Sequence, residues 1–206
     1  MNIAGEIAEK AGELFDVFGV RRYPEGGFLL VLGLESTPER NLDDFGRSGG
    51  QFHLYGYEEY VAPRLKELLG FIRKKGFTAD PAGRYGYPLE GEIPLKSEAI
   101  SAGLGKRGRS TVVLHPEYGN RLRFMAVLTD APLERLVGED LPDEEAPVCR
   151  NCTICIDACT VSILEPCRMT DPSICLSNVN PVDERGHSIL CDLCLKLCPE
   201  SKRKQV

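Results

Sequence analysis

Apolar residues in the first third of the chain follow two helical patterns and one strand pattern. They recur at helical spacing over residues 3–18, and Gly19 follows as a stop. Residues 28–32 are instead a short continuous apolar run, whose length favours a buried strand over a helix. Helical spacing returns over residues 61–72, and Gly76 ends it. The pattern therefore predicts two amphipathic helices, with a buried strand between them in the sequence.

Polar segments separate these elements and follow them. Residues 35–57 are rich in Ser, Pro, Asp and Gly, which predicts a long loop across the surface or over a site. Residues 111–115 and 122–129 have the character of strands, and the turn at residues 116–120 between them predicts a hairpin. Residues 133–147 are rich in Glu, Asp and Pro, and they predict a linker to the end of the chain.

The composition changes at this linker. All nine cysteines lie after it, and the net charge of −6 comes from residues 1–148, with 18 basic and 24 acidic side chains against 7 of each in residues 149–206. A chain of 206 residues suits one domain with a small appendage. We therefore predict an α+β fold with two parts, a core of residues 1–146 and a cysteine module of residues 147–206.

The composition also argues against several classes of function. No apolar run approaches the ~20 residues that span a bilayer, so no membrane partner is expected. A net acidic protein is a poor match for nucleic acid, because binding depends on neutralising phosphates. The N-terminus lacks the basic and apolar regions of a signal peptide, which predicts a cytoplasmic protein.

Eight of the cysteines form two runs with the spacing of iron–sulfur ligands. The first run is C-x2-C-x2-C-x3-C, and the second supplies one distant cysteine followed by C-x2-C-x3-C-P. In such runs three thiolates surround one [4Fe–4S] cluster, and the cysteine after the x3 step reaches the other. We assign the first cluster to Cys149, Cys152, Cys155 and Cys198. We assign the second cluster to Cys159, Cys175, Cys191 and Cys194.

Zinc and disulfides are the alternatives for these cysteines, and the spacing favours clusters over both. Zinc sites use two C-x2-4-C pairs a dozen or more residues apart, without a third cysteine at x2 or a fourth at x3. Disulfides are typical of a secreted chain. Thr160 follows the first run where ferredoxins usually carry proline, a residue that shapes the exit turn and ligates nothing. Cys167 is left over, and we expect it to be a buried, inert thiol.

A glycine-rich stretch at residues 102–111 precedes the predicted hairpin. Its glycines let the backbone approach a ligand, and exposed amides in such a loop can hold an anionic group. Lys106, Arg107 and Arg109 add positive charge. A glycine-rich turn with solvated cations is the alternative, and the glycine spacing fits neither a P-loop nor a Rossmann fingerprint.

The order of four features resembles that of a known family. They are the loop at Ala102–Gly105, the turn that holds Pro116–Gly119, the stretch Val127–Leu133 and the two cysteine runs. This order is similar to that of the epoxyqueuosine reductases and the related reductive dehalogenases. The similarity is good over residues 55–200 and loose over residues 1–54. The resemblance implies a nitroreductase-like α/β core and a ferredoxin-like C-terminal module, whose two [4Fe–4S] clusters feed a corrinoid.

The resemblance also implies site residues for that corrinoid (cobalamin). They are Gly103, Leu104, Gly105, Gly108, Ser110 and Thr111. The chain departs from the family at residues 106–110, which read Lys-Arg-Gly-Arg-Ser where the family usually shows Trp-Ile-Gly-Lys-Asn. The family's catalytic aspartate has no counterpart upstream. Glu90, Glu92 and Tyr85 are the candidate proton donors there, with solvated or packing roles as the alternative.

We therefore expect an iron–sulfur oxidoreductase whose clusters pass electrons to a corrinoid that reduces a small substrate. A reductant protein such as ferredoxin or flavodoxin would supply the electrons. The sequence ends at Val206, without the helical-repeat extension of many epoxyqueuosine reductases, and this argues against transfer RNA as a partner. The alternative is a ferredoxin-like electron-transfer protein without its own cofactor or substrate chemistry. The sequence leaves open the substrate, the donor, the oligomeric state and whether the core holds a corrinoid, a flavin or nothing.

Overall fold

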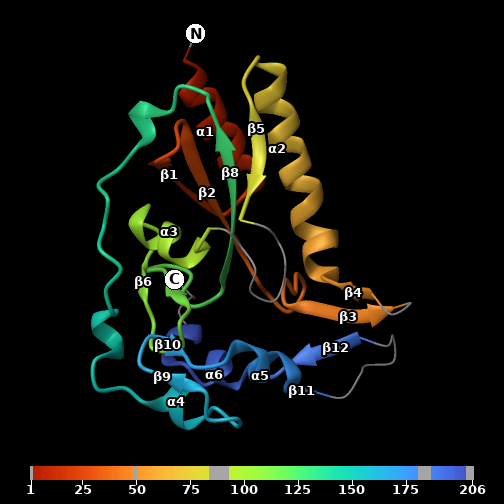
Figure 1. Ribbon diagram of the computed structural model, residues 1–206, viewed down its shortest axis with the longest axis vertical. Helices are drawn as coiled ribbons and strands as arrows, with labels where there is room; N and C mark the ends of the chain where they lie inside the picture. The colour runs from red at the N-terminus through yellow and green to blue at the C-terminus, as the bar shows by residue number, and fades with distance from the viewer. Residues whose placement is uncertain (1, 49–50, 84–92, 181–186, 203–206) are drawn as a thin grey trace.

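The computed structural model shows a mixed α/β protein with the cysteine module folded against one end of the core (Figure 1). It describes residues 2–48, 51–83, 93–180 and 187–202. In Figure 1 the core fills the upper part of the view, and the cysteine module lies below it. Within these residues, no helix is long and apolar enough to cross a membrane.

The core is built on a four-stranded antiparallel sheet in the order β1-β2-β8-β5. Its strands are β1 (Val17–Arg22), β2 (Phe28–Glu35), β8 (Leu122–Thr129) and β5 (Ala79–Ala82). β2 pairs with β8 along its whole length and with β1 on its other side. The strand predicted at residues 28–32 is confirmed, and it continues to Glu35.

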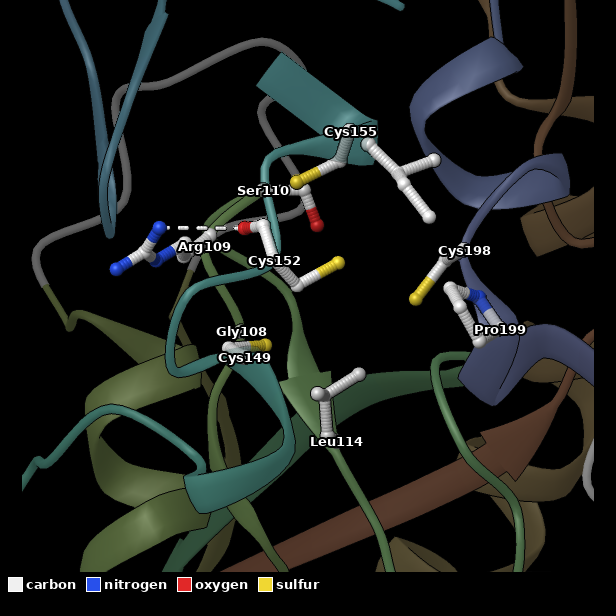
Figure 2. A pocket seen from close by; sticks show the side chains of 10 residues that line it. Gly108, Arg109, Ser110, Leu114, Cys149, Cys152, Cys155, Cys198 and Pro199 are labelled. Atoms are coloured by element: carbon white, nitrogen blue, oxygen red, sulfur yellow. Dashed lines mark hydrogen bonds between the residues drawn. The ribbon is translucent and has the colours of Figure 1, made fainter. Parts of the chain in front are cut away.

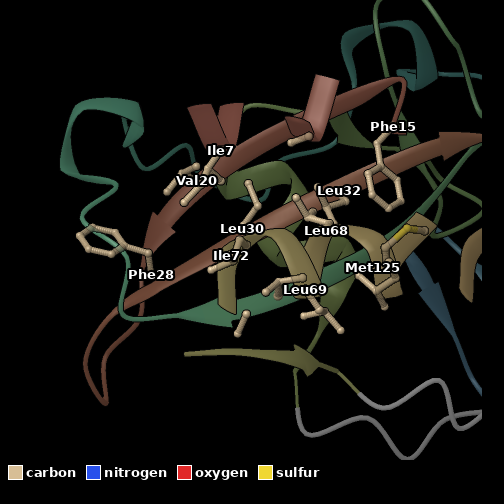
Figure 3. Close-up of a cluster of buried hydrophobic side chains, with 14 of the residues drawn as sticks. Ile7, Phe15, Val20, Phe28, Leu30, Leu32, Leu68, Leu69, Ile72 and Met125 are labelled. Atoms are coloured by element: carbon tan, nitrogen blue, oxygen red, sulfur yellow. The ribbon is translucent and has the colours of Figure 1, made fainter. Parts of the chain in front are cut away.

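Helices cover both faces of this sheet. α1 (Ile3–Leu14) and α2 (Ala62–Lys74) pack on one face, which also takes the even-numbered side chains of β2 (Figure 3). Side chains fully buried there include Ile7, Ala11, Leu30, Leu32, Leu68 and Ile72. α3 (Leu95–Ser101) packs against Leu29 and Val31 on the other face. Because β2 is buried on both faces, its sequence is continuously apolar instead of alternating.

Two predicted helices are found, one with a different end. The helix predicted over residues 3–18 ends at Leu14, because the last apolar residues of that run belong to β1 and pair with β2. The helix predicted over residues 61–72 is confirmed as α2, which follows a π-helical turn, η1 (Tyr57–Val61).

The predicted hairpin is wrong. β7 (Val113–Leu114) pairs with β6 (Lys106–Arg107), whereas β8 lies between β2 and β5 in the main sheet. Strand character alone does not identify the partner of a strand. β8 is paired on both sides within the central sheet, and the short β7 pairs instead with β6, which precedes it in the chain.

The loop predicted over residues 35–57 contains two strands that join the core to the cysteine module. β3 (Asp44–Ser48) pairs with β4 (Gln51–His53) and, on its other side, with β12 (His187–Leu190). β11 (Val179–Asn180) completes this second sheet, in the order β11-β12-β3-β4. Main-chain hydrogen bonds therefore run directly between the two parts of the protein.

The remaining elements are short. They are η2 (Glu134–Leu136), η3 (Pro147–Cys149), α4 (Ile154–Asp157), β9 (Leu164–Glu165), β10 (Arg168–Met169), α5 (Pro172–Ser177), α6 (Leu193–Lys196) and η4 (Pro199–Lys202). The linker carries η2 and runs down one side of the molecule, on the left in Figure 1, to reach the module.

Polar contacts from the turn before β8 fix the end of the module to the core. The buried side chain of Asn120 donates from Nδ2 to the carbonyl oxygen of Leu195 at 2.9 Å. Arg121 donates to the carbonyl oxygen of Ser201 at 2.8 Å. These bonds pair partly buried backbone carbonyls of the module with side chains of the core.

The same turn requires a glycine at position 119, and this requirement can be tested. Gly119 has a φ of 57°, and a Cβ atom there would overlap the carbonyl oxygen of Glu200. We expect Gly119→Ala to lower the free energy of unfolding by at least about 1 kcal/mol, because it adds both strain and a clash. The control is Gly138→Ala, since a Cβ atom at Gly138 meets open space. Equal denaturant midpoints for the two variants would contradict this account of the contact.

Candidate functional site

Four cysteines line one pocket where the core meets the cysteine module (Figure 2). They are Cys149, Cys152, Cys155 and Cys198, the set that the spacing assigns to the first cluster. The core supplies part of the wall through Gly108, Arg109, Ser110 and Leu114. The pocket holds about 300 Å³ of space outside the protein atoms, part of it open to solvent. Figure 2 shows the sulfurs of Cys152 and Cys198 pointing toward each other across this space.

Arg109 ties this wall to the module and to the linker. Its guanidinium donates to the carbonyl oxygen of Cys152 at 3.2 Å and to the carboxylate of Glu145 at 3.1 Å. Its own carbonyl oxygen accepts from the backbone N–H of Cys167 at 3.1 Å. The position of the glycine-rich stretch relative to the cysteines is therefore fixed by hydrogen bonds from three separate segments.

The four thiols of this pocket lie close together, and Cys149 and Cys155 are buried. Burial raises the pKa of Cys155, and the neighbouring thiols Cys149, Cys198 and Cys152 raise it further. The pKa of Cys149 is raised by the same two causes. Like-charged thiolates at this separation repel one another, so the set favours a cation or an iron centre that offsets their charge.

The other four assigned cysteines also lie close to one another. Burial raises the pKa of Cys194 to about 12, and Cys175, Cys191 and Cys159 are among the thiols that raise it further. Burial likewise opposes ionisation of Cys159, but backbone N–H groups of residues 161–164 donate toward its sulfur and lower its pKa overall. This second set therefore includes one thiol that the local backbone prepares to be a thiolate.

The cluster assignment rests on the cysteine spacing, and the structure adds that four of the assigned thiols line one pocket. Among the described residues, no group of three or more His, Cys, Asp and Glu side chains is close enough to hold one ion. A [4Fe–4S] cluster takes four thiolates, each on a different iron, so its ligands stand farther apart than those around one zinc ion. Four thiols that line a common space are the arrangement that such a cluster needs.

Cys167, the ninth cysteine, lies near the first set but does not line its pocket. Its thiol is half-buried, and its Sγ lies 3.6 Å from the carboxylate of Glu145. Burial and this carboxylate raise its pKa to about 11, so the thiol stays protonated at neutral pH.

The glycine-rich stretch is packed against other parts of the chain, and its role in lining a cofactor stays a prediction. A Cβ atom at Gly105, where φ is 140°, would lie 2.5 Å from the carbonyl oxygen of Leu114. Leu104 is buried in the core, and a Cβ atom at Gly103 would make only an ordinary contact, 3.9 Å from the side chain of Leu141. Gly108 and Ser110 belong to the wall of the cysteine pocket. The glycines therefore serve close packing within the chain, and the stretch offers little free surface to a large flat ligand.

The cations of this stretch pair with three consecutive acids of the linker. Arg107 contacts Asp143, Arg109 contacts Glu145, and Lys106 lies 3.9 Å from Glu144. Backbone bonds between Arg107 and residues 144 and 146 reinforce the contact. These ion pairs join the stretch to the linker, and the role of its cations toward an anionic cofactor tail stays a prediction.

Lys96 is a functional candidate that the sequence did not reveal. Its ammonium donates to Thr111 Oγ1 at 3.1 Å. The residue is exposed on the surface, whereas nearby protein atoms partly desolvate its amine and, together with the charges of Arg107 and Arg123, lower the pKa of the amine to about 8. Burial raises the pKa of Cys175, and the positive charge of the amine offsets part of this rise by favouring the thiolate. The thiols of Cys175 and Cys194 in turn favour the charged amine.

Thr111, which accepts the hydrogen bond from Lys96, has a strained backbone conformation. Its φ is 73°, which is rare for a β-branched residue and costs of order 1–3 kcal/mol. The residue is buried, and its carbonyl oxygen accepts from Arg107 at 3.0 Å. Strain that persists because the surroundings fix it is typical of functional sites. The predicted proton donors Glu90, Glu92 and Tyr85 lie outside the described residues.

Comparison with known proteins supports the resemblance seen in the motifs. No family model matches the chain. The epoxyqueuosine reductase of Cyclobacterium marinum is 26% identical over 214 residues, which cover 96% of this chain and 66% of that protein. The tetrachloroethene reductive dehalogenase of Desulfitobacterium hafniense is 31% identical over 122 residues, 57% of this chain and 20% of that protein. The chain therefore spans less than two thirds of the length of these curated relatives.

Solved structures of both enzyme classes share the mixed helix and strand fold. One is a crystal structure of epoxyqueuosine reductase with an epoxyqueuosine-modified tRNA stem loop. It superposes with a TM-score of 0.67 over 98% of this chain and 66% of that chain, at 17% identity. An identity this low shows the fold alone.

These relatives correct the exclusion of transfer RNA. A protein of this fold is solved with a tRNA stem loop, so neither the net charge of −6 nor the position at which the sequence ends excludes such a partner. Net charge is an average over the whole surface, whereas nucleic acid binds a local basic patch. In sequence and in fold, the chain resembles the epoxyqueuosine reductases and the reductive dehalogenases, as its motifs predict.

Proposed function

We propose that this chain is an iron–sulfur reductase that passes electrons through two [4Fe–4S] clusters to an acceptor beside Lys96. The observation that carries the proposal is the pocket that gathers Cys198 with three cysteines of the first run. The proposed ligands of the second cluster are Cys159, Cys175, Cys191 and Cys194. A cytoplasmic location, where thiols stay reduced, is part of the proposal.

When bound, the clusters would supply one-electron transfer, and the residues of the chain would orient and shield them. Gly108, Ser110 and Leu114 close the core side of the first pocket and limit water there. Arg109 keeps that wall in register with Cys152. Near the second set, Thr111 holds the Lys96 ammonium in a fixed position, where it can meet negative charge that develops on an acceptor.

The resemblance implies that the acceptor of these electrons is a corrinoid. The described residues support this only in part. Most of the predicted lining is packed against the chain, and Thr111 is the member that reaches toward Lys96. We therefore derive no step through a corrinoid, and we propose its binding as a separate matter for a direct test.

The relatives suggest two classes of substrate for the proposed reductase. Their names refer to epoxyqueuosine, which one structure contains within a tRNA stem loop, and to tetrachloroethene. Both names describe reductions, in which the substrate gains electrons. An electron carrier without substrate chemistry is the less favoured alternative, because the sequence relatives are named as reductases.

Iron content tests the ligand assignment. Protein prepared without oxygen should contain about eight iron atoms per chain, since two sites of four thiolates are available. Cys159→Ser should remove the cluster held by Cys175, Cys191 and Cys194, although Cys159 belongs to the other run. The control, Cys167→Ser, should leave the iron content unchanged. Stoichiometric zinc in place of iron would contradict the assignment.

The clusters should also hold the cysteine module together. Among the described residues, the module buries few apolar side chains, chiefly Ile163 and Leu164, and so small a core is marginal without staples. Chelation of the iron should therefore abolish hydrogen-exchange protection in residues 149–201, while amides of β2 and β8 stay protected. Amides of the module that remain protected after chelation would contradict this expectation.

Turnover tests the function itself. The iron-loaded protein should reduce an epoxyqueuosine-containing stem loop or a chlorinated ethene when dithionite is the donor, and Cys198→Ser should lose this activity. Titration with cobalamin under reducing conditions should change the visible spectrum if the corrinoid binds. Iron-loaded protein that reduces neither substrate, with or without cobalamin, would favour the electron-carrier alternative.

A further inference from the structure

The side chain of His115 stabilises the turn that follows β7. Its Nδ1 accepts hydrogen bonds from the backbone N–H groups of Glu117 at 3.1 Å and of Tyr118 at 3.3 Å. The backbone of His115 also exchanges two hydrogen bonds with that of Gly119, each at 2.9 Å. The imidazole therefore acts on this turn as the side-chain oxygen of Asp or Asn acts in an Asx turn, where it accepts from the backbone two residues further on.

These bonds determine which protonation state of the imidazole the turn requires. A ring nitrogen that accepts a hydrogen bond carries no proton, so the proton of the neutral ring lies on Nε2. In the charged imidazolium both ring nitrogens are donors. Protonation of His115 would therefore remove the acceptor of two backbone N–H groups and place a positive charge against them. The turn is built for a neutral histidine.

The same turn contacts the segment that carries Cys198. Asn120 donates to the carbonyl oxygen of Leu195, and this oxygen also accepts from the backbone N–H of Cys198 at 3.3 Å. Gly119 packs against the carbonyl oxygen of Glu200, two residues after that cysteine. The turn therefore contacts the chain on both sides of Cys198, the thiol that comes from farthest along the sequence to the first pocket.

His115 also adjoins the wall of that pocket, because Leu114 before it is one of the lining residues. Charged and titratable side chains come to this turn from the turn itself and from η4. The turn supplies Glu117 and Tyr118, whose ring centroid lies 5.2 Å from that of the imidazole, and η4 supplies the buried Glu200. In general carboxyl and phenol groups titrate at about pH 4 and about pH 10, whereas an imidazole titrates at about pH 6.5. A change of this turn near neutral pH therefore points to the histidine.

We propose that His115 is a positioning residue for the first cluster, whose neutral imidazole holds the turn that fixes Cys198, so that mild acid loosens this ligand. The part that concerns iron rests on the proposed function, whereas the part that concerns the turn does not. Because the two hydrogen bonds require the neutral ring, their contribution to stability is complete above about pH 6.5 and is lost as the pH falls below it. Loss of the fourth ligand should then speed the release of iron.

The test measures how fast an iron chelator removes iron from the loaded protein, without oxygen, between about pH 8 and about pH 5.5. Each variant is compared with the wild-type protein at the same pH, which cancels the acid sensitivity of the cluster and of the chelator. His115→Ala lacks the acceptor at every pH. At pH ~8 it should lose iron about tenfold faster than the wild type, the order expected for these hydrogen bonds, and at pH ~5.5 the two rates should converge.

His115→Asn is the matched variant, since the Asn side-chain oxygen can accept from the same backbone groups and does not titrate. It should lose iron as slowly as the wild type at pH ~8 and about tenfold more slowly than the wild type at pH ~5.5. Glu117→Gln removes a carboxyl group from the turn, keeps the histidine and should retain the wild-type profile. This pattern separates the titration of one imidazole from general damage to the fold, which would act at every pH.

Two results would overturn the inference while leaving the clusters in place. One is a His115→Asn profile that follows the wild type at every pH, and the other is a His115→Ala variant that keeps its iron as well as the wild type at pH ~8. Protein without iron would instead overturn the proposed function. Nitrogen NMR of the imidazole in that protein still tests the turn, because it reports which ring nitrogen carries the proton. A proton on Nδ1 of His115 at pH ~8 would then overturn the inference, and a proton on Nε2 alone would support it.

Discussion

The pocket that brings Cys198 beside Cys149, Cys152 and Cys155 is the constraint on which the rest of this structure depends. It requires the last turn of the chain to return to the start of the cysteine module. It also requires the core to close one wall. Three hydrogen bonds satisfy these requirements. Asn120 and Arg121 donate to the carbonyl oxygens of Leu195 and Ser201, and Arg109 donates to that of Cys152 in the first run. All three donors lie in the segments on either side of β7. The core is therefore a partner in building the pocket.

The linker contributes to the same constraint through charge. Each of its three consecutive acids pairs with one cation of the glycine-rich stretch. These ion pairs hold the linker beside the pocket, just before the first cysteine run in the sequence. Exposed ion pairs such as Lys106–Glu144 are individually weak, but the pairs of Arg107 and Arg109 are partly buried, and backbone hydrogen bonds join Arg107 to the linker. Glu145 then has two roles, since it holds Arg109 and also lies next to Cys167.

The sequence predicts those features that local spacing determines, and it fails where the partner is distant. The runs of cysteines, the two long helices and the buried strand β2 follow from periodicity, because each is encoded within a dozen residues or so. The pairing of β8, and of β3 with β12, depends on strands far away in the chain. Glycine has the same limitation. In the sequence, Gly105 is equally compatible with close approach of a ligand and with close packing against Leu114, and only the structure distinguishes the two.

Lys96 shows why a single side chain escapes sequence analysis, and what the strain at Thr111 achieves. A lone lysine in an amphipathic helix normally faces solvent, and no motif distinguishes this one. Residues 108–111 nevertheless link both cysteine sets, since Gly108 and Ser110 line the first pocket while Thr111 holds Lys96 toward the second. To reach both sides in four residues, the chain must turn sharply, and it does so at Thr111 with a positive φ. A glycine there would adopt this turn without strain but would lose the hydroxyl that positions Lys96. The unfavourable conformation is thus the consequence of placing a hydrogen-bond acceptor at a sharp turn between the two sites.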